Sequence, residues 1–308
     1  MAFANPTDAY TATDLAAMID EKWSSLVLEP KFENATISAW VTDLSPFMSA
    51  SGDIVHVPEI YTNQFTVQTQ STQGNGVVDE SVAQVDKTIT VNTHKYVAFL
   101  IGNKDMAQLV KSYNLNERYL EEVRNLLARA LEDALFALWS SITTNSVGDT
   151  GTVLTDLEIR QAIAKLDNTN LLEYGKVAFF FHPIVYWHQV AALQKFYDKS
   201  INGMESIIAT GAFGSIRSMN RKGSLYDIPV FTSPRVVSGL QTYRNMLLHK
   251  EAMGFAVQTN GGGMIRTHVS YLHQNLATLA TGEIIYGVGM LREPSAVLIN
   301  ANTTATAA

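Results

Sequence analysis

The feature that most constrains this chain is a long polar excursion between two strand-like segments. Residues 54–60 and 88–91 carry alternating apolar and polar side chains, which is typical of strands with one buried face. Between them, residues 68–78 read QTQSTQGNGVV and hold too few apolar side chains to form a core. A ribbon that cannot bury itself needs another surface to lie on. The alternative is an ordinary hairpin turn at Asn75 and Gly76, a step that favours positive φ.

A long amphipathic helix is predicted for residues 117–142. Its apolar side chains recur every three or four residues and so share one stripe: Leu120, Val123, Leu127, Ala130, Leu131, Ala134, Leu138 and Ile142. The charged side chains fall on other faces, where we expect solvent or a neighbouring subunit: Glu121, Arg124, Glu132 and Asp133. Such a helix spans roughly 39 Å at the standard rise. That length suits a structural spine, although a core helix of a globular enzyme would show the same pattern.

The rest of the chain divides into an N-terminal arm and an α/β module. The arm contains one predicted helix at residues 14–28. In the module, Thr155 followed by Glu158 is a capping-box pattern that predicts a helix to about residue 166, and Pro183 predicts the start of another. Residues 202–223 are predicted as loops. Apolar runs predict strands at residues 177–181, 228–231, 244–249, 255–258, 268–281 and 283–299.

Composition excludes several classes of protein. The 308 residues carry a net charge of −7 without any cluster of Lys and Arg, which argues against a dedicated nucleic-acid binder. The chain has no cysteine, so disulfides, thiolate nucleophiles and iron–sulfur clusters are absent, and a reducing cytoplasm suits it. The N-terminus lacks the pattern of a signal peptide, and no run of about 18 apolar residues occurs. We therefore expect a protein that is neither secreted nor membrane-spanning.

The histidines do not form a recognisable metal or acid–base site. His182 and His188 are six residues apart, so one helix would not place them on a single face. His268 and His273 would point to opposite faces of a strand. His249 lies beside two charged residues, but neighbours in sequence do not face each other on regular structure. None of these spacings matches a zinc motif. We expect structural roles for all five.

The remaining motifs also fail as catalytic signatures. The glycines at 261–263 and 287–289 do not extend to a phosphate-binding loop, and no serine-hydrolase elbow occurs. The acidic pairs at 121–122 and 132–133 fall on the predicted long helix, where a solvent-facing or intersubunit role is expected. We therefore predict no catalytic, cofactor-binding or metal-binding residue, no cofactor and no enzymatic activity.

The order of these segments resembles the major capsid protein of tailed bacteriophages, the Hong Kong ninety-seven type fold. The likeness covers nearly the whole chain. Its first half is carried by three segments: GDIVHVPEI, KTITVNTHKYVAFLIGNKDMAQ and YLEEVRNLLARALEDALFALWSSI. Its second half is carried by four more: VAFFFHPIVYWHQVAAL, GSLYDIPVFTSP, RNMLLHKEAMGFAVQ and GEIIYGVGMLREPSAVLI. The order of these patterns is more specific than any one of them.

The resemblance implies an α+β chain with the phage major capsid fold. Five parts follow from it, in chain order: an N-terminal arm (1–50), an extended β-hairpin loop (51–95), a peripheral domain with a long spine helix (96–150), an α/β axial domain (151–266) and return strands of the peripheral domain (267–308).

The resemblance also implies a function. Copies would form hexamers and pentamers that close into an icosahedral shell around double-stranded DNA, without sequence-specific contacts and without a membrane. We expect a virion capsid assembled in the bacterial host cytoplasm, with a separate scaffolding protein, a portal and possible decoration proteins as partners. Some relatives join subunits through a lysine-to-asparagine isopeptide bond, for which Lys87 and Asn300 are the candidate pair. Without such a bond, large and mostly apolar interfaces must stabilise the shell.

Two alternatives stay open. An encapsulin-like compartment shares this fold and would enclose protein cargo in place of DNA. A cytoplasmic α/β enzyme belongs to a different class, and a soluble monomer that forms no particles would favour it.

Overall fold

The computed structural model describes residues 35–48, 52–60, 67, 80, 84–102, 104, 115–193, 221–239, 242–259 and 263–302. The predicted helix at 14–28 and the polar segment 68–78 lie outside the described residues. In chain order the strands are β1 (Thr42–Asp43), β2 (Ile54–Ile60), β3 (Gln84–Thr90), β4 (Thr93–Gly102), β5 (Ser146–Val147), β6 (Val177–Phe181), β7 (Arg221–Leu225), β8 (Ile228–Thr232), β9 (Thr242–His249), β10 (Met253–Val257), β11 (Arg266–Leu272), β12 (Ala277–Met290) and β13 (Ala296–Asn302). The helices are α2 (Leu115–Ala137), α3 (Asp156–Asn168) and α4 (Pro183–Val185). Short 3₁₀ turns occupy Ser45–Met48, Leu138–Ser141 and Glu293–Ser295, and a π turn occupies Tyr186–Val190.

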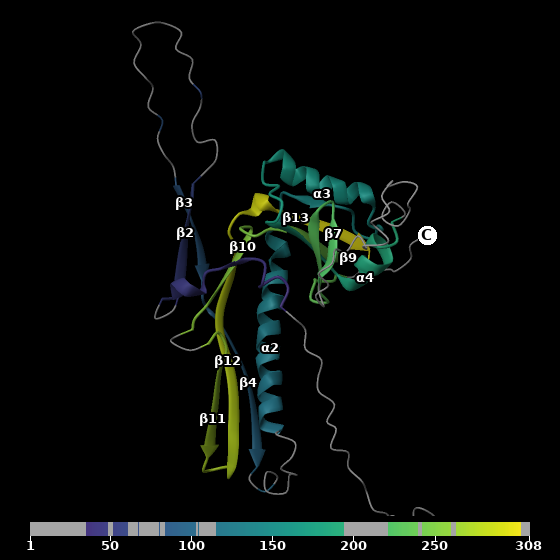
Figure 1. Ribbon diagram of the computed structural model, residues 1–308. Helices are drawn as coiled ribbons and strands as arrows, with labels where there is room; N and C mark the ends of the chain where they lie inside the picture. Colours follow the sequence, from purple (N-terminus) through teal and green to yellow (C-terminus); the bar gives the residue numbers. More distant parts are fainter. Residues whose placement is uncertain are drawn as a thin grey trace, which may run out of the picture.

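The strands form two large sheets and a separate hairpin. One sheet has six strands in the order β5-β13-β9-β6-β8-β7, and the other has β1-β10-β12-β11 with β4 on the opposite side of β12. In Figure 1 the six-stranded sheet lies in a compact part with α3 and α4, whereas β4, β11 and β12 extend away as a long ribbon. Among the described residues, strands β2 and β3 pair only with each other, and they project from the body as a hairpin.

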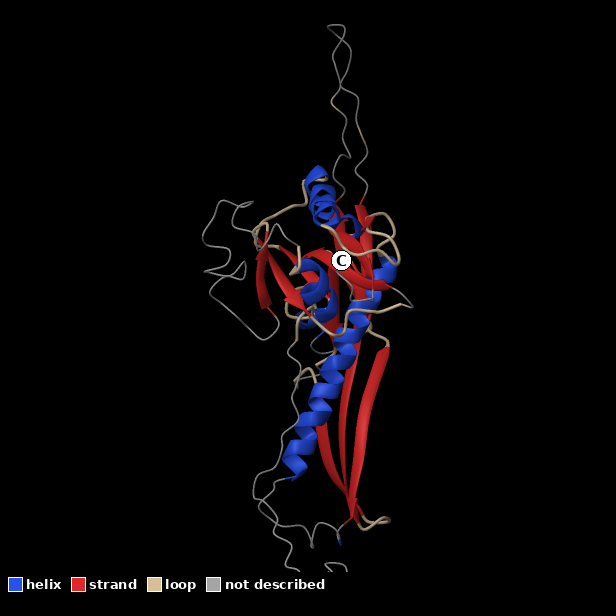
Figure 2. Ribbon diagram, turned by 90° about the vertical axis from the view of Figure 1, so that its right-hand side faces the viewer, coloured by secondary structure: helices blue, strands red, loops and turns tan. Residues whose placement is uncertain are grey.

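The long helix α2 runs along this ribbon and packs against β4 and β12, as Figures 1 and 2 show. Its buried stripe includes Val123, Leu127 and Leu131, each no more than 6% exposed. The same core holds Phe180 from β6 and Ile284 from β12, so α2 joins the two sheets. The predicted stripe is confirmed, although the α-helix ends at Ala137 and continues as a 3₁₀ turn.

Two further cores complete the body. The opposite face of the six-stranded sheet packs against α3 and α4, with Phe179 and Ile159 among its fully buried side chains. Because α2 covers the other face, the run VAFFF of β6 is buried at every position, and its predicted bounds are confirmed. A small third core under the root of the β2–β3 hairpin includes Val55, Ile89 and Leu291.

Residues 35–48, which we call the N-terminal belt, cross both sheets. The Trp40 ring lies 5.6 Å from the Phe231 ring on the six-stranded sheet. Thr42 then pairs with Gly254 in the five-stranded sheet. The sequence predicts an extended arm up to residue 50, but the belt is docked on the body.

The C-terminal strands differ from the prediction. Residues 268–281 and 283–299 are predicted as two strands that break at Gly282, whereas β12 is continuous through this residue and the turn lies at 273–276. Gly282 does not end the strand. It allows α2 to pack closely against β12, because a Cβ atom at this position would overlap the Val123 side chain. The chain leaves the strand only after Met290.

Sheet membership also crosses the predicted boundary between residues 266 and 267, in both directions. Strand β10 falls within the predicted axial segment 151–266 but pairs with β12 in the five-stranded sheet. Strand β13 falls within the predicted peripheral segment 267–308 but pairs with β9 in the six-stranded sheet. These pairings join residues far apart in sequence, which local patterns do not reveal. In addition, β7 begins inside the segment 202–223, which is predicted as loops.

Candidate interaction surfaces

Two of the five histidines considered above, His182 and His249, make packing and hydrogen-bond contacts within the body. His182 stacks on Tyr243 with ring centroids 3.9 Å apart, and its Nδ1 accepts a hydrogen bond from the Ile184 N–H. Burial lowers the pKa of His182 to about 4, so the ring is neutral at pH 7. His249 is buried, and its Nδ1 accepts from the Glu251 N–H. Within the described part of the chain, no three His, Cys, Asp or Glu side chains lie close enough to hold a metal ion.

The remaining predicted histidines lie at the surface and are not brought together. His188 follows α4, His268 lies on β11, and His273 lies in the turn after β11 with its ring edge-on to Tyr271. The helices of the described segments include none with the length and hydrophobicity that crossing a bilayer requires.

A buried carboxylate on α2 holds the start of the N-terminal belt. Glu132 is only 6% exposed. Its carboxylate accepts hydrogen bonds from the backbone N–H groups of Thr36, Ile37 and Ser38, at 3.2, 3.1 and 3.0 Å. The hydroxyls of Thr36 and Ser38 also donate to it. The sequence predicts a solvent-facing or intersubunit role for this residue, which is wrong because the belt covers it.

A second carboxylate holds the chain that follows the spine helix. Glu293 Oε1 accepts from the N–H and the hydroxyl of Thr143 at 2.8 and 2.7 Å. It accepts the same pair of bonds from Thr144, at 3.0 and 2.7 Å. These hydrogen bonds, first of all those from the two hydroxyls, lower the pKa of Glu293 to about 2. The carboxylate thereby ties the segment between β12 and β13 to the segment between α2 and β5.

The neighbouring residue, Arg292, ties the hairpin to the body. Its Nε lies 3.3 Å from Glu59 on β2, and its Nη1 lies 3.5 Å from Glu251 in the turn between β9 and β10. These groups and Lys87 line a groove of about 380 Å³ at the root of the hairpin. The groove also has an apolar wall that includes Leu291. Charged and apolar contacts therefore both hold the hairpin root.

The hairpin buries one face at its root only. Val55 and Ile89 point into the third core, whereas Ile54, His56 and Thr88 are exposed on the other side. The hairpin has no other strand beside it in the described part of the chain. An isolated two-stranded hairpin is marginal in water, so a further surface would stabilise it.

The ribbon of β4, β12 and β11 carries large apolar side chains on its outer face. Val97 and Phe99 point toward α2, so the alternate residues Tyr96 and Leu100 point away from it and are 72% and 48% exposed. Val269 of β11 is 59% exposed on the opposite face, because it pairs with Ala280, the partner of Phe99. Exposed apolar side chains on one extended sheet are typical of interaction sites.

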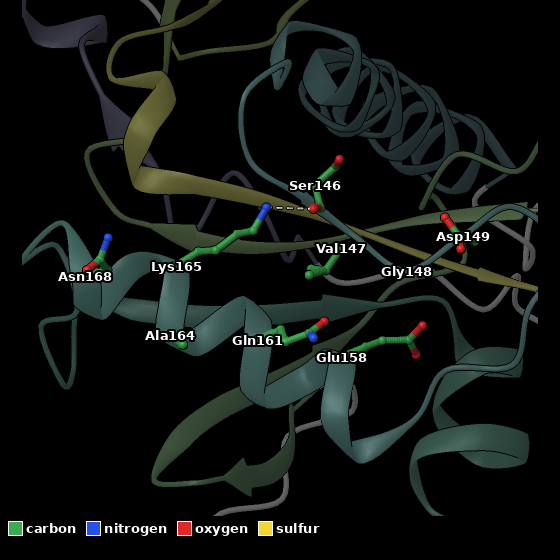
Figure 3. Close-up of a pocket in the computed structure, with 9 residues that line it drawn as sticks. All are labelled: Ser146, Val147, Gly148, Asp149, Glu158, Gln161, Ala164, Lys165 and Asn168. Atoms are coloured by element: carbon green, nitrogen blue, oxygen red, sulfur yellow. Dashed lines mark hydrogen bonds between the residues drawn. The ribbon is translucent and has the colours of Figure 1, made fainter.

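An open groove between α3 and β5 has a volume of about 860 Å³ (Figure 3). One face of α3 forms a wall, with Glu158, Gln161 and Lys165 along it. Lys165 Nζ donates to the Ser146 carbonyl at 2.8 Å and so occupies an acceptor of this edge strand. A lysine at a sheet edge discourages the addition of another strand. The groove is open, whereas a small-molecule site usually buries most of its ligand.

Comparison with known proteins gives two different results. Neither a protein-family model nor a curated protein matches the chain. Solved structures match over nearly its whole length. A structure from Mycobacterium phage Che8 superimposes with a TM-score of 0.71 at 15% identity, covering 91% of this chain and 96% of that chain.

Two capsid structures give similar values. The capsid structure of cyanophage P-SCSP1u has a TM-score of 0.70 at 13% identity and covers 94% of each chain. The mature capsid of bacteriophage PhiM1 has a TM-score of 0.70 at 14% identity and covers 96% of each chain. The predicted α+β fold is therefore confirmed, and this chain has the fold of these phage structures.

Proposed function

We propose that this chain, which has the fold of phage capsid structures, is the major capsid protein of a tailed bacteriophage. One observation carries the proposal, namely that the match extends over more than nine-tenths of both chains for three separate phage structures. An unrelated enzyme would not reproduce the belt, the hairpin, the spine helix and both sheets in one order.

The surfaces of this chain support the same proposal. The projecting hairpin and the outer face of the ribbon expose backbone and apolar side chains, among them Ile54, Tyr96 and Leu100. In a shell, neighbouring copies would cover these surfaces. The low fraction of charged residues, 17%, fits a chain whose surface is largely in contact with other copies.

In this proposal the six-stranded sheet with α3 and α4 forms the axial domain of hexamers and pentamers. The spine helix and the ribbon form the peripheral domain. Double-stranded DNA fills the shell and is held without sequence readout, which a net charge of −7 permits because no basic surface is required. A separate scaffolding protein assists assembly in the host cytoplasm, and a portal and possible decoration proteins complete the virion.

Noncovalent contacts hold this shell together. The candidate isopeptide residue Asn300 is partly buried in the body, where its side chain accepts from Arg244 at 2.6 Å and donates to the Gly148 carbonyl at 3.2 Å. Its amide would have to leave both partners before Lys87 of a neighbour could attack it. Denaturing gel electrophoresis of particles tests this point, since cross-linked subunits would migrate as multimers.

Negative-stain microscopy of the purified protein, alone and co-expressed with its scaffolding gene, tests the proposed function. Closed shells of uniform size are expected. Nuclease-protected double-stranded DNA in particles from lysed host cells would support a virion, whereas shells filled with protein cargo would favour an encapsulin-like compartment. A monodisperse monomer under all of these conditions would contradict the capsid function and favour the enzyme.

A further inference from the structure

The junction between the spine helix and the N-terminal belt has the features of a dedicated binding site. Glu132 is only 6% exposed, and a carboxylate buried to this extent without partners would cost several kcal/mol. Five donors from three consecutive residues, Thr36 to Ser38, satisfy both of its oxygens. Hydrogen bonds to an ionised acceptor are stronger than neutral ones.

The geometry is selective for a carboxylate. All five partners are donors, so the group at this position has to be an acceptor on both of its terminal atoms. A glutamine has the same shape but presents an NH₂ donor in place of one oxygen. That NH₂ would face N–H and O–H groups, and at least one buried donor would lose its partner.

Downstream of residues 36–38 the belt is held by the buried Val41 and by the pairing of β1 with β10, so Glu132 acts on its first residues. Downstream, Trp40 contacts Phe231 and lies 4.9 Å below the Lys250 ammonium, and both contacts are at a partly exposed surface. At the start of the belt, Ala35 is exposed. Ala35 and Ser38 form one wall of a half-enclosed cavity of about 210 Å³ above α2. Releasing residues 36–38 would therefore open this cavity to water.

We propose that Glu132 is a positioning residue that fixes where, and in which direction, the chain preceding residue 35 leaves the body. Loosening residues 36–38 is then expected to disturb contacts with neighbouring copies. The effect on neighbouring copies rests on the proposed capsid function, whereas the anchoring of residues 36–38 does not.

Amide hydrogen exchange of the full chain tests the anchor directly. Glu132→Gln is compared with Glu122→Gln, the same substitution at an exposed position of the same helix. Exchange at residues 36–41 should rise about tenfold or more in Glu132→Gln, as expected for losing a charged hydrogen-bond partner, while β6 and β9 keep their protection. The Glu122→Gln variant should match the wild type at all of these positions.

Two results would overturn the assignment of Glu132 as the anchor of the belt. One is unchanged exchange at residues 36–41 in Glu132→Gln. The other is an equal rise in β6 and β9, which would show that Glu132 only contributes to global stability. If Glu132→Gln does not fold, Ser38→Ala decides the same question, because it removes one donor and keeps the carboxylate. That variant should also raise exchange at residues 36–41 alone, and an unchanged rate would count against the anchor.

Particle yield tests the consequence for assembly. Glu132→Gln should fold, release the belt and form several-fold fewer closed shells than Glu122→Gln. A wild-type yield from a variant whose belt exchanges fast would overturn the role of the anchor in assembly. If the wild type forms no shells under any condition, the capsid function fails, and the exchange result still decides whether Glu132 positions the belt.

Discussion

At the scale of single residues, two carboxylates at distant points of the fold each anchor a connecting segment. Glu132 and Glu293 each accept hydrogen bonds from backbone N–H groups and hydroxyls of consecutive residues. A carboxylate offers about four acceptor sites, so one side chain can hold a whole turn of a connecting segment. The two differ in burial, because Glu132 is covered by the belt and Glu293 is partly exposed.

The pKa of Glu293 predicts a dependence of stability on pH. Its pKa is lowered to about 2 from a usual value of 4.5, so its stabilising contribution is present above pH 4.5 and is lost as the pH falls toward 2. Glu293→Gln should therefore lower the free energy of unfolding at pH 7. The difference from the wild type should shrink between pH 4.5 and pH 2.

Denaturant unfolding at several pH values measures this difference. Glu122→Gln, which changes an exposed carboxylate of α2, controls for the general effect of removing one negative charge. A difference between wild type and Glu293→Gln that stays constant from pH 7 to pH 2 would contradict the assigned hydrogen bonds.

Gly287 is required by a close approach between the chain entering β4 and the strand β12. A Cβ atom on Gly287 would overlap the carbonyl of Thr90, and backbone cannot move aside as a flexible side chain can. Gly287→Ala should cost about 1–3 kcal/mol of stability, the usual range for overpacking. Thermal unfolding measures the loss. Gly263→Ala is the control, since its Cβ would have no neighbour closer than 3.8 Å, and an equal effect of both changes would refute the explanation.

At the scale of elements, the spine helix α2 is the part that the two sheets share. Leu127 is 2% exposed and faces this shared core, while its neighbour Leu126 is 41% exposed. Leu127→Asp should prevent folding, because an unpaired buried charge costs several kcal/mol against a marginal total stability. Leu126→Asp makes the same substitution on the outer face and should yield soluble, folded protein.

Soluble expression and circular dichroism distinguish the two variants. Aggregation of Leu127→Asp with a native spectrum for Leu126→Asp is the expected pair of results. A soluble and assembly-competent Leu127→Asp would mean that the buried face of α2 is assigned wrongly.

The sequence predicts those elements whose signals are local. Strand β6 is predicted with its bounds because all five of its side chains are apolar, and α3 because Thr155 and Glu158 form a capping box. The predicted strand break at Gly282 is wrong. In sequence, a glycine that ends a strand cannot be distinguished from one that makes room for a helix packed on the sheet. Glu132 is missed because its partners lie about 95 residues away, and helical periodicity shows only that it is outside the apolar stripe.

At the scale of the whole molecule, the projecting hairpin contributes little to the body. Its root is fixed by Val55 and Ile89 in the third core, and within the described segments β2 and β3 pair only with each other. Removing residues 68–78 should therefore leave the melting temperature of the monomer nearly unchanged but block shell closure. Melting curves and particle counts measure the two effects separately. Unaltered particle yield and particle stability would contradict a role of this loop between subunits.

The N-terminal belt also has a consequence for folding during synthesis. Strand β1 pairs with residues 254 and 255, which leave the ribosome roughly 200 residues later. At the usual rate of translation this delay is about 10 to 40 s. Strands β4 and β5 also wait for distant partners, β12 and β13 respectively, which are among the last strands to emerge. Neither sheet can close until the last forty or so residues emerge, so the nascent chain exposes its apolar strands throughout this time and depends on the cell's chaperones to stay soluble.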